Sequence, residues 1–600
     1  MTRGRGTEPH WAAGATGAAI GLLAVGAAGL LGASCLPFDV VRSWLDAWTA
    51  DGHADLFTKE LFDRIVIKAR LGSGALALVC ALGYVARRPI ARYLDQLVSD
   101  AVTAIAAARR LGDTIRREPP SHWWTLSIIV LVAIGTRLCF LSQPMRYDEA
   151  FTFMQYVSKP LVVGLSRYFP NNHLFHTFLA HLTAGFFGTA PWAIRLPAFL
   201  AGVLLVPAAY VVARQHYGRH AALVAAGLVA ASSPLVGFST VARGYTLMLL
   251  CFLTIAALAP SLLRQRNRAA WALFALVSAL GFYTVPLMLY PFGVVVVWLI
   301  LSVAAGESPL PRQHVVRDLL LAVGLTVGLA ALLYLPSLVV TGVSSLTTRG
   351  IATVPSWADL LRGHLKDLRY LWAEWNRDVP VAISLLLIIG CLIATVAHRR
   401  LGRYRIPWVF AAALWCLPLL ALQGIHPPVR MWLFLLPLYF AAAASGLIAL
   451  MDRIVQTIAR AVKAVPSYAV CVTALMLTVG VGLNVIRTRS VYYSDDTGTG
   501  LRDAEQIARF LKEELRPGDR ILAATPSEAP LEYYLYRHQV PVTYLFTGLG
   551  FTNRLFIVVN EPRQTIDALV GPSLRGPEYT EPALVQRYRF ASLYEIRQRP

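Results

Sequence analysis

Long apolar runs alternate along this chain with short polar segments that carry most of its charge. An α-helix needs about 20 apolar residues to cross a hydrocarbon core about 30 Å thick, so each long run predicts a membrane span. We therefore predict a polytopic α-helical membrane protein with about 13 transmembrane helices. The predicted spans are residues 11–34, 71–88, 124–142, 196–213, 220–236, 245–263, 269–284, 286–305, 318–341, 379–397, 407–423, 431–450 and 467–487.

Basic clusters between these runs predict how the chain is oriented, because Lys and Arg accumulate on the cytoplasmic side of a membrane. The clusters alternate correctly only if residues 143–195 remain on one side. That segment includes NNHLFHTFLAHLTAGFFG, which is apolar but contains His173, His176 and His181. We therefore predict interfacial helices in this first large outer loop. The N-terminus is then expected in the cytoplasm and the C-terminus outside.

The pattern changes after about residue 491. LRDAEQIARFLKEELRPGDRILAAT predicts an amphipathic helix, a turn and a short strand, and EAPLEYYLYRH predicts a second helix. VPVTYLF and RLFIVVNE predict two further strands. This alternation of helices and strands is typical of a small α/β domain, which we expect on the outer side.

Composition excludes several classes of protein. The chain is 56% hydrophobic and 15% charged, whereas soluble domains are nearer one quarter charged. Its net charge of +21 is dispersed between the apolar runs, so we expect no nucleic-acid partner. The seven cysteines have neither metal-site nor disulfide-framework spacing. The apolar run near the N-terminus is longer than the core of a signal peptide and predicts a first span.

The outer loops contain the residues with candidate chemistry. Asp148 and Glu149 stand together in YDEA, directly after the third predicted span. In a helix, neighbouring side chains point about 100° apart, so we expect the two carboxylates to do different jobs. The other candidates are Asn172 and His173 in NNHLFH, Arg243 and Tyr245 in FSTVARGYT, Tyr283 in GFYTVPLMLYP, and His426 and Arg430 in QGIHPPVRMW.

A carboxylate among arginines at the outer membrane surface suits a sugar donor linked to a lipid phosphate. Arginine binds phosphate through a forked set of donors and stays charged when partly desolvated. It can stabilise charge that develops on a phosphate leaving group. A carboxylate can take the proton from an acceptor hydroxyl. Two other interpretations are open: the carboxylates are ordinary charged loop residues, and tyrosines such as Tyr283 belong to an interfacial aromatic belt.

The order of these features resembles glycosyltransferase family 39, of the glycosyltransferase C (GT-C) superfamily. The similarity covers residues 123–450 and rests on YDEA, NNHLFH, FFGTAPWAIRLPAFLAGVLLVPAAYVVAR and SSPLVGFSTVARGYTLML. The family includes protein O-mannosyltransferases and the lipid A aminoarabinose and galacturonic acid transferases. The resemblance implies a GT-C-like transmembrane fold, a polyprenyl-phosphate sugar donor and an inverting transfer at the outer face.

The resemblance also implies roles for single residues. Asp148 falls on the acidic position of the first large loop, and Arg430 on an arginine near the start of the penultimate matching span. Some relatives carry a second acid in the second outer loop, where this chain has VARGYT with Arg243. This departure weakens the case for a divalent metal between two acids, so we predict neither a metal nor another cofactor.

Together these features predict three domains and an enzyme. Residues 1–122 are an N-terminal extension with two transmembrane helices, 123–490 a GT-C-like catalytic domain, and 491–600 a periplasmic or extracellular α/β domain. We expect a hexosyl- or pentosyltransferase in a bacterial inner membrane, which moves sugar from a polyprenyl-phosphate donor to an envelope lipid, glycan or protein acceptor.

In this hypothesis Asp148 is the general base. Arg243 and Arg430 hold the departing phosphate, while Glu149 and His173 position the sugar or the acceptor. The sequence does not choose the sugar or the acceptor. The alternative is a lipid or solute transporter, or a scaffold for envelope assembly, without glycosyl transfer. Transporters keep ionisable groups mid-membrane and often show inverted repeats, whereas these charges lie at the ends of spans and no internal symmetry is found.

Overall fold

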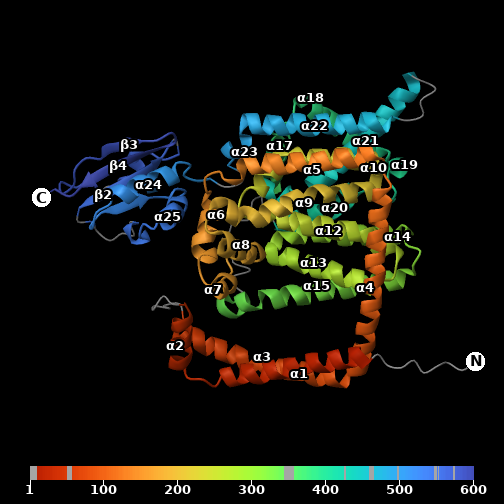
Figure 1. The fold of residues 1–600 in the computed structure, drawn as a ribbon, viewed down its shortest axis with the longest axis horizontal. Helices are drawn as coiled ribbons and strands as arrows, with labels where there is room; N and C mark the ends of the chain where they lie inside the picture. The colour runs from red at the N-terminus through yellow and green to blue at the C-terminus, as the bar shows by residue number, and fades with distance from the viewer. Residues whose placement is uncertain are drawn as a thin grey trace, which may run out of the picture.

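The fold is a helical bundle with a small sheet at one end (Figure 1). The computed structural model describes residues 10–49, 57–342, 357–423, 428–458, 465–495, 499–545, 551, 553–561, 563–571 and 574–599. Within this part of the chain, nine helices are long and apolar enough to cross a membrane. They are α1 (His10–Ala33), α3 (Lys59–Val85), α5 (Pro120–Leu141), α9 (Pro191–Tyr217), α12 (Tyr245–Arg264), α14 (Leu289–Ala304, after the 3₁₀ turn η2, Pro286–Met288), α15 (Arg312–Thr341), α21 (Leu435–Ile458) and α22 (Ser467–Thr488).

The remaining predicted spans also coincide with helices. The pair α10 (Arg219–Ala231) and α11 (Ser233–Ser239) passes the same test as one bent segment. The predicted spans 269–284, 379–397 and 407–423 correspond to shorter apolar helices of 16 or 17 residues, whose crossing stays a prediction: α13 (Arg268–Thr284), α18 (Val381–Val396) and α20 (Trp408–Gln423). The predicted polytopic helical class is thus confirmed.

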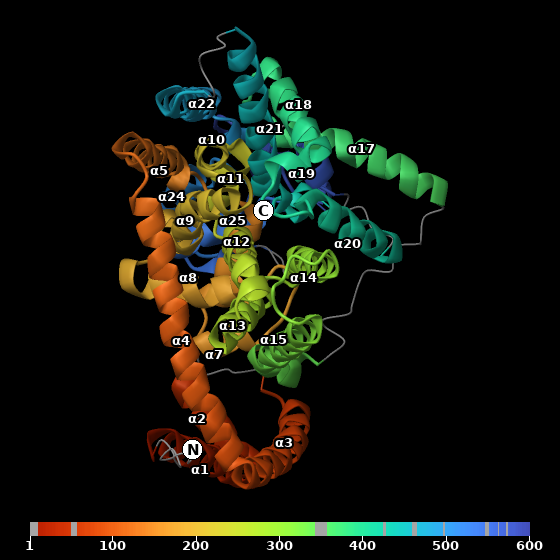
Figure 2. The same cartoon turned by 90° about the vertical axis from the view of Figure 1, so that its right-hand side faces the viewer.

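The N-terminal extension forms a helical hairpin beside the bundle. Helices α1 and α3 pack side by side, and the long helix α4 (Arg87–Arg116) crosses the end of the bundle that lies away from the sheet (Figures 1 and 2). The Asp100 carboxylate on α4 accepts a hydrogen bond from the backbone N–H of Arg268 at 2.9 Å. This contact joins α4 to the start of α13. The connecting helices are α2 (Phe38–Thr49), the 19-residue α17 (Trp357–Trp375), α19 (His398–Leu401), the 3₁₀ turn η3 (Val429–Trp432) and α23 (Ser490–Tyr493).

A break between α10 and α11 directs the chain into the second outer loop. The two helices meet at 57°. Pro234 has no N–H, so the carbonyl of Ala230, four residues earlier, lacks its usual helical donor. The buried guanidinium of Arg137 on α5 supplies one, with Nη1 at 2.8 Å from that carbonyl, and its Nε also donates to Ser239 Oγ at 3.1 Å. Arg137 therefore holds both halves of the broken helix.

The first outer loop contains short helices at the end of the bundle that carries the sheet (Figure 1). The longest, α8, is a 14-residue apolar helix and too short to count as a span. This length agrees with the predicted interfacial segment, although its depth in a membrane stays a prediction. The loop helices are α6 (Tyr147–Thr152), the π-helix η1 (Phe153–Val157), α7 (Leu161–Ser166) and α8 (Leu174–Phe187).

The C-terminal unit is a four-stranded sheet with helices, as predicted in class. Its strand order is β1-β2-β4-β3, with β1 parallel to β2 and the other pairs antiparallel. Both predicted helices and the strands in RILAAT and RLFIVVNE are confirmed. The elements are α24 (Ala504–Glu514), β1 (Arg520–Ala523), α25 (Glu528–Arg537), η4 (Val542–Tyr544), β2 (Arg554–Asn560), α26 (Ile566–Leu569), β3 (Ala583–Arg587) and β4 (Ala591–Arg597).

Two features of this unit differ from the prediction. The predicted strand in VPVTYLF is wrong, because residues 542–544 form a 3₁₀ turn. Among the described residues of this stretch, only Leu545 forms a bridge, to Ile521. The hairpin β3–β4 was not predicted. All five residues of β3 are exposed, so this strand lacks the alternation of apolar and polar positions that marks a half-buried strand.

The C-terminal unit and the first outer loop share one hydrophobic cluster. The rings of Phe153 and Tyr533 meet edge to face with centroids 5.2 Å apart. The Tyr534 hydroxyl accepts a hydrogen bond from the backbone N–H of Met145 at 3.2 Å. The sheet unit is therefore packed directly against the segment that carries YDEA.

Candidate functional site

The carboxylate of Glu149 is buried at the centre of a polar network. One oxygen, Oε1, accepts the backbone N–H of Arg146 at 2.9 Å and a bond from the Arg195 guanidinium. The other, Oε2, accepts Arg195 Nε at 3.0 Å and the backbone N–H of Ala242 at 2.7 Å. The side chain of Glu149 is 1% exposed and that of Arg195 is fully buried. This network joins the start of α6, helix α9 and the second outer loop.

The expected contact of Glu149 with the sugar or the acceptor stays a prediction. Both oxygens have two donors each, and no face of the carboxylate is open. Arg195 further donates to the carbonyls of Leu141 and Gln143, at 2.8 and 2.6 Å. Glu149 consequently joins the start of α6 to Ala242, the residue before Arg243. The two carboxylates of YDEA do point to different partners, as α6 geometry requires.

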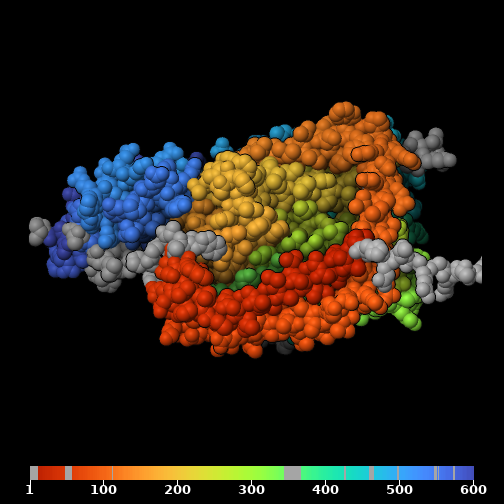
Figure 3. Space-filling view, turned by 60° about the horizontal axis from the view of Figure 1, so that its bottom comes forward, coloured from red at the N-terminus to blue at the C-terminus, as the bar shows by residue number. Residues whose placement is uncertain are grey.

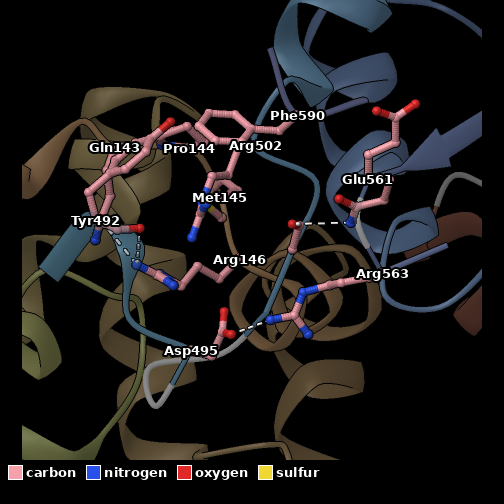
Figure 4. Close-up of a pocket in the computed structure, with 12 residues that line it drawn as sticks. Gln143, Pro144, Met145, Arg146, Tyr492, Asp495, Arg502, Glu561, Arg563 and Phe590 are labelled. Atoms are coloured by element: carbon pink, nitrogen blue, oxygen red, sulfur yellow. Dashed lines mark hydrogen bonds and ion pairs between the residues drawn. The ribbon is translucent and has the colours of Figure 1, made fainter. Parts of the chain in front are cut away.

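Arg146 anchors the other side of YDEA to the chain that leads into the C-terminal unit. Its guanidinium donates to the carbonyls of Val491, Tyr492 and Ser494. A cavity of about 340 Å³ lies here between the two parts of the molecule. Figure 4 shows Asp495 and Arg563 paired at its wall, with Arg146 directed at Tyr492. Helix α6, which carries Asp148, is thus held by Arg146 on one side and by the Glu149–Arg195 pair on the other.

Asp148 and Arg243 are brought together through Asn171. The side-chain amide of Asn171 donates to Asp148 Oδ1 at 3.5 Å, and its backbone carbonyl accepts Arg243 Nη1 at 2.6 Å. Arg243 Nη1 also donates to Thr152 Oγ1, at 3.0 Å. Asp148 is half-buried, whereas Arg243 is 4% exposed. Residues of two separate outer loops thus form one polar site.

The charge of Arg243 has no carboxylate partner among its contacts in the described part of the chain. Its partners are a hydroxyl, a carbonyl and the ring of His173, all neutral. Within the same residues, its Nε has no hydrogen-bond partner at all. A buried cation without a counter-ion is costly, so a bound anion would stabilise this arrangement.

His173 is a neutral imidazole, and each of its ring nitrogens lies close to an N–H group of the second loop. Nδ1 accepts the backbone N–H of Gly244 at 2.8 Å, and Nε2 lies 3.2 Å from Arg243 Nη2. Burial, with the positive charges of Arg243 and Arg430, lowers the pKa of His173 well below its usual value. With Nδ1 as the acceptor, the proton of the neutral ring is on Nε2. An Nε2–H and a guanidinium then face one another, and both can donate to a third group.

Gly244 permits this close packing. A Cβ at that position would lie 2.4 Å from Thr284 Cγ2 and 3.1 Å from His173 Nδ1, so no larger residue fits. Tyr245 follows, and its ring meets that of His173 edge to face with centroids 4.9 Å apart. Tyr245 is only 5% exposed. The order ARGY thus supplies a cation, a residue without a side chain and an aromatic wall in sequence.

Arg430 belongs to the same electrostatic environment. It stands in η3, immediately before α21, and is half-buried. It is among the charges that lower the pKa of His173. Arg430 therefore contributes positive charge at His173 from a distant part of the sequence. His426, from the same hairpin, lies outside the described residues.

Two other candidates have structural partners in place of an open face. The Asn172 amide donates to the carbonyls of Gly164 and Arg167, at 2.9 and 2.8 Å, and its oxygen accepts from Thr177. Asn172 therefore links α7 to α8 within the loop, and its contact with substrate stays a prediction. Tyr283 is 7% exposed and packs edge to face against Tyr334. It supports the site from behind.

Sequence reasoning did not assign roles to Arg137 and Arg195. Both are arginines inside apolar runs, where a charge is tolerated only with buried polar partners. That signal was present in the sequence, but the partners belong to distant segments. Among the described residues, no group of three or more His, Cys, Asp or Glu is arranged to hold a metal ion.

A separate apolar cavity of about 320 Å³ lies between α18, α20 and α21. Trp432, two residues after Arg430, lines it, and it continues past Cys416 to His398. Its lining is almost wholly aliphatic and aromatic. This composition suits a hydrocarbon chain.

Residues 171–335 match the family described as dolichyl-phosphate-mannose-protein mannosyltransferase. The matched segment contains Asn172, His173, Arg243, Tyr245 and Tyr283, so the resemblance to glycosyltransferase family 39 is confirmed there. Asp148 and Arg430 lie outside it. No curated protein matches the chain.

Several solved structures are similar to this chain at low identity. ArnT from Cupriavidus metallidurans in the apo state is 14% identical, with a TM-score of 0.45, over 78% of this chain and 97% of that chain. The same protein bound to undecaprenyl phosphate is 13% identical, with a TM-score of 0.46, over 80% of this chain and 98% of that chain. The oligosaccharyltransferase of Archaeoglobus fulgidus in complex with zinc and sulfate is 12% identical, with a TM-score of 0.45, over 68% of this chain and 61% of that chain. At these values no residue role is transferred.

Proposed function

We propose that the protein is a membrane glycosyltransferase that uses a sugar linked to a polyprenyl phosphate. The observation that carries this proposal is the joining of Asp148 and Arg243 through Asn171. An acid and an uncompensated cation in one small site match the two demands of the reaction, which are a base for the acceptor and a counter-charge for the leaving phosphate. The similarity of residues 171–335 to the dolichyl-phosphate-mannose-protein mannosyltransferase family supports a donor of the same class.

The phosphate of the donor would bind at Arg243, His173 and Arg430. Arg243 Nε has no partner among the described residues, and the Nε2–H of His173 is directed at the same guanidinium. A phosphate oxygen between them would accept from both donors and neutralise the buried charge. Arg430 would add a second positive charge near His173. Tyr245 would close this side of the site.

The sugar would be transferred in one inverting displacement. Asp148 would take the proton from the acceptor hydroxyl while the hydroxyl oxygen bonds to the anomeric carbon. The bond from that carbon to the phosphate oxygen would break on the opposite side, and polyprenyl phosphate would leave with its added negative charge. Arg243 and Arg430 would stabilise that charge as it develops. Glu149 would take no part except to hold the backbone in place.

The apolar cavity beside Trp432 would hold part of the polyprenyl chain. Trp432 lines this cavity and is two residues after Arg430, so a phosphate at the arginine would leave the first isoprene units near the cavity. Each buried methylene is worth about 0.8 kcal/mol, so such a cavity would contribute much of the donor's affinity.

The reaction would take place on the outer face of a bacterial inner membrane. The basic clusters on the other side of the spans, including those on α4, support a cytoplasmic N-terminus. The C-terminal unit would then be periplasmic or extracellular. The acceptor would be an envelope lipid, a glycan or a protein with an accessible hydroxyl.

The proposal is tested by transfer from a polyprenyl-phosphate sugar with purified full-length protein. Release of polyprenyl phosphate should require both Asp148 and Arg243. The variants Asp148→Asn and Arg243→Gln should keep the thermal stability of the parent within a few degrees and lose transfer. Full transfer by a folded Asp148→Asn variant would refute the assignment of the base. Alternating exposure of both residues to the two sides of the membrane would instead indicate a transporter.

A further inference from the structure

The N-terminal hairpin contains a basic cavity that the proposed transfer does not use. Its volume is about 400 Å³, and it lies where the beginning of α1 meets the end of α3 and the first turns of α4. The α1 wall consists of small or apolar residues, and the α4 wall carries arginines. The lining residues are Ala13, Gly17, Ile20, Tyr84, Arg87, Arg88, Ala91 and Arg92.

The cavity has a strong positive charge. Its eight lining residues include three arginines and no acid. Arg87 stacks over the Tyr84 ring at 4.4 Å from its centroid. In the described part of the chain, no ion pair or hydrogen bond is found for the guanidinium groups of Arg87, Arg88 and Arg92. Three guanidinium groups of like charge repel one another unless an anion lies among them. Arginine is the side chain best suited to phosphate.

The cavity lies at the ends of two lipid-facing helices. Only 11% of the apolar window of α1 and 6% of that of α3 are buried inside the protein. Figure 3 shows the hairpin as an outer layer along the bundle. Leu82, Tyr84 and Val85 at the end of α3 are all more than half exposed. An anion held by the arginines would therefore sit at head-group depth, beside surfaces that are covered by acyl chains.

We propose that this cavity binds the phosphate of an anionic phospholipid in the cytoplasmic leaflet. Arg87, Arg88 and Arg92 would hold the phosphate, while the acyl chains would lie against α1 and α3. Basic pockets between transmembrane helices on this side of a membrane are suited to such head groups. A soluble phosphate would satisfy the charges but leave the neighbouring apolar surface unused.

Occupancy would also strengthen the attachment of the hairpin. Helix α4 begins at the cavity and reaches α13 through Asp100. A lipid bound by α1, α3 and α4 together would hold the hairpin at one angle to α4. The N-terminal extension would then be a lipid-dependent support for the bundle.

The test uses purified full-length protein in nanodiscs of phosphatidylcholine alone, or of equal parts phosphatidylcholine and phosphatidylglycerol. Retention of phosphatidylglycerol is measured by native mass spectrometry and stabilisation by thermal unfolding. The parent should retain phosphatidylglycerol and unfold at a higher temperature in its presence. The triple variant Arg87→Gln/Arg88→Gln/Arg92→Gln should bind this lipid at least about tenfold more weakly, because each arginine contributes about a fivefold factor near a surface.

Two further variants separate a site from general charge attraction. Arg109→Gln/Arg110→Gln/Arg117→Gln removes the same charge from exposed positions farther along α4 and should retain phosphatidylglycerol. Gly17→Leu keeps every charge and projects a side chain into the cavity, where a Cβ meets nothing within 4 Å. It should reduce retention even if the first triple variant fails to fold.

Three results would overturn the proposal. One is equal loss of lipid in both triple variants, which would indicate general attraction. Another is equal stabilisation of the parent by inorganic phosphate in phosphatidylcholine discs, which would indicate a soluble anion. The third is a Gly17→Leu variant that retains phosphatidylglycerol like the parent. None of these measurements involves sugar transfer, so the outcome is independent of the proposed enzymatic function.

Discussion

Glu149 and Arg195, 46 residues apart, form an ion pair that is excluded from solvent. The Arg195 Nε lies 3.0 Å from Glu149 Oε2, and the same oxygen accepts the backbone N–H of Ala242. The pair therefore connects α9 to both outer loops that form the candidate site. Its effect on the site is indirect, through the backbone positions of Asp148 and Arg243.

Removing one partner of this pair should destabilise the protein strongly. Glu149→Gln leaves the Arg195 charge buried and unpaired, so we expect a loss of about 3–5 kcal/mol in the free energy of unfolding. Thermal unfolding in detergent measures this change. Glu505→Gln removes an acid that is 34% exposed and pairs with Arg509, Arg537 and His538, and should cost at most about 1 kcal/mol. A Glu149→Gln variant as stable as Glu505→Gln would contradict the positioning role.

Asp148→Asn should leave stability nearly unchanged and slow transfer strongly. Asparagine has nearly the shape of aspartate and can still contact the Asn171 amide through its oxygen, so stability should change little. Loss of the base should slow transfer by about 10²–10⁴-fold, with the effect in kcat. Single-turnover assays with a polyprenyl-phosphate sugar measure it. Asp567→Asn, at an 83% exposed side chain of the sheet unit, is the matched control and should transfer at the parental rate.

Arg243→Lys tests the geometry of the site separately from its charge. Lysine keeps the positive charge but cannot donate at once to Thr152, to the Asn171 carbonyl and to a phosphate. We expect transfer to fall by about 10²–10³-fold, the usual loss when one stabilising donor is misplaced. Steady-state kinetics with varied donor would show a lower kcat. An unchanged kcat with only a higher KM would indicate uniform binding of the donor instead.

Gly244→Ala should disrupt the site by steric conflict. The added methyl would lie 2.4 Å from Thr284 Cγ2 and 3.1 Å from His173 Nδ1, so the ring or the loop must move. Transfer should fall by at least about tenfold, since a displacement near 1 Å is enough for a loss of this size. Gly185→Ala, in α8 of the first outer loop with nothing within 4 Å of its Cβ, is the control and should be active.

Stability should decline in mild acid because two histidines of the outer loop are buried in neutral form. Burial is the main cause that lowers the pKa of His173 well below its usual value and that of His176 to about 3. The unfolded chain takes up these protons near pH 6.5, but the folded chain does not. Stability is therefore constant above that pH and falls below it, by up to about 1.4 kcal/mol per pH unit for each histidine.

Thermal unfolding at pH 7.0 and 5.5 checks this expectation. His176→Phe removes one buried imidazole without adding a polar group, so the difference between the two pH values should shrink. The same difference for His314→Asn, far from the loop in sequence and at the start of α15, should equal that of the parent. An identical pH response of all three proteins would contradict the assignment to His176.

The sequence by itself determined the helical architecture, because a bilayer imposes a minimum length on every span. Each predicted span coincides with a helix or with the bent pair α10–α11. It also predicts outer loops for Asp148, His173, Arg243 and Arg430, since basic clusters mark the opposite side. The hairpin β3–β4 could not be predicted, because its outer strand has no buried face.

Only the tertiary structure decided what each polar residue contacts. Asp148 and Glu149 are adjacent in sequence, yet one faces Asn171 and the other is enclosed by Arg195 and Ala242. No local pattern distinguishes them, because the partners come from α9 and the second outer loop. The same holds for Arg137, whose role depends on a carbonyl left without a donor by Pro234 on another helix. Local chemistry set the spans and loops, and long-range hydrogen bonds selected which of the loop residues form the site.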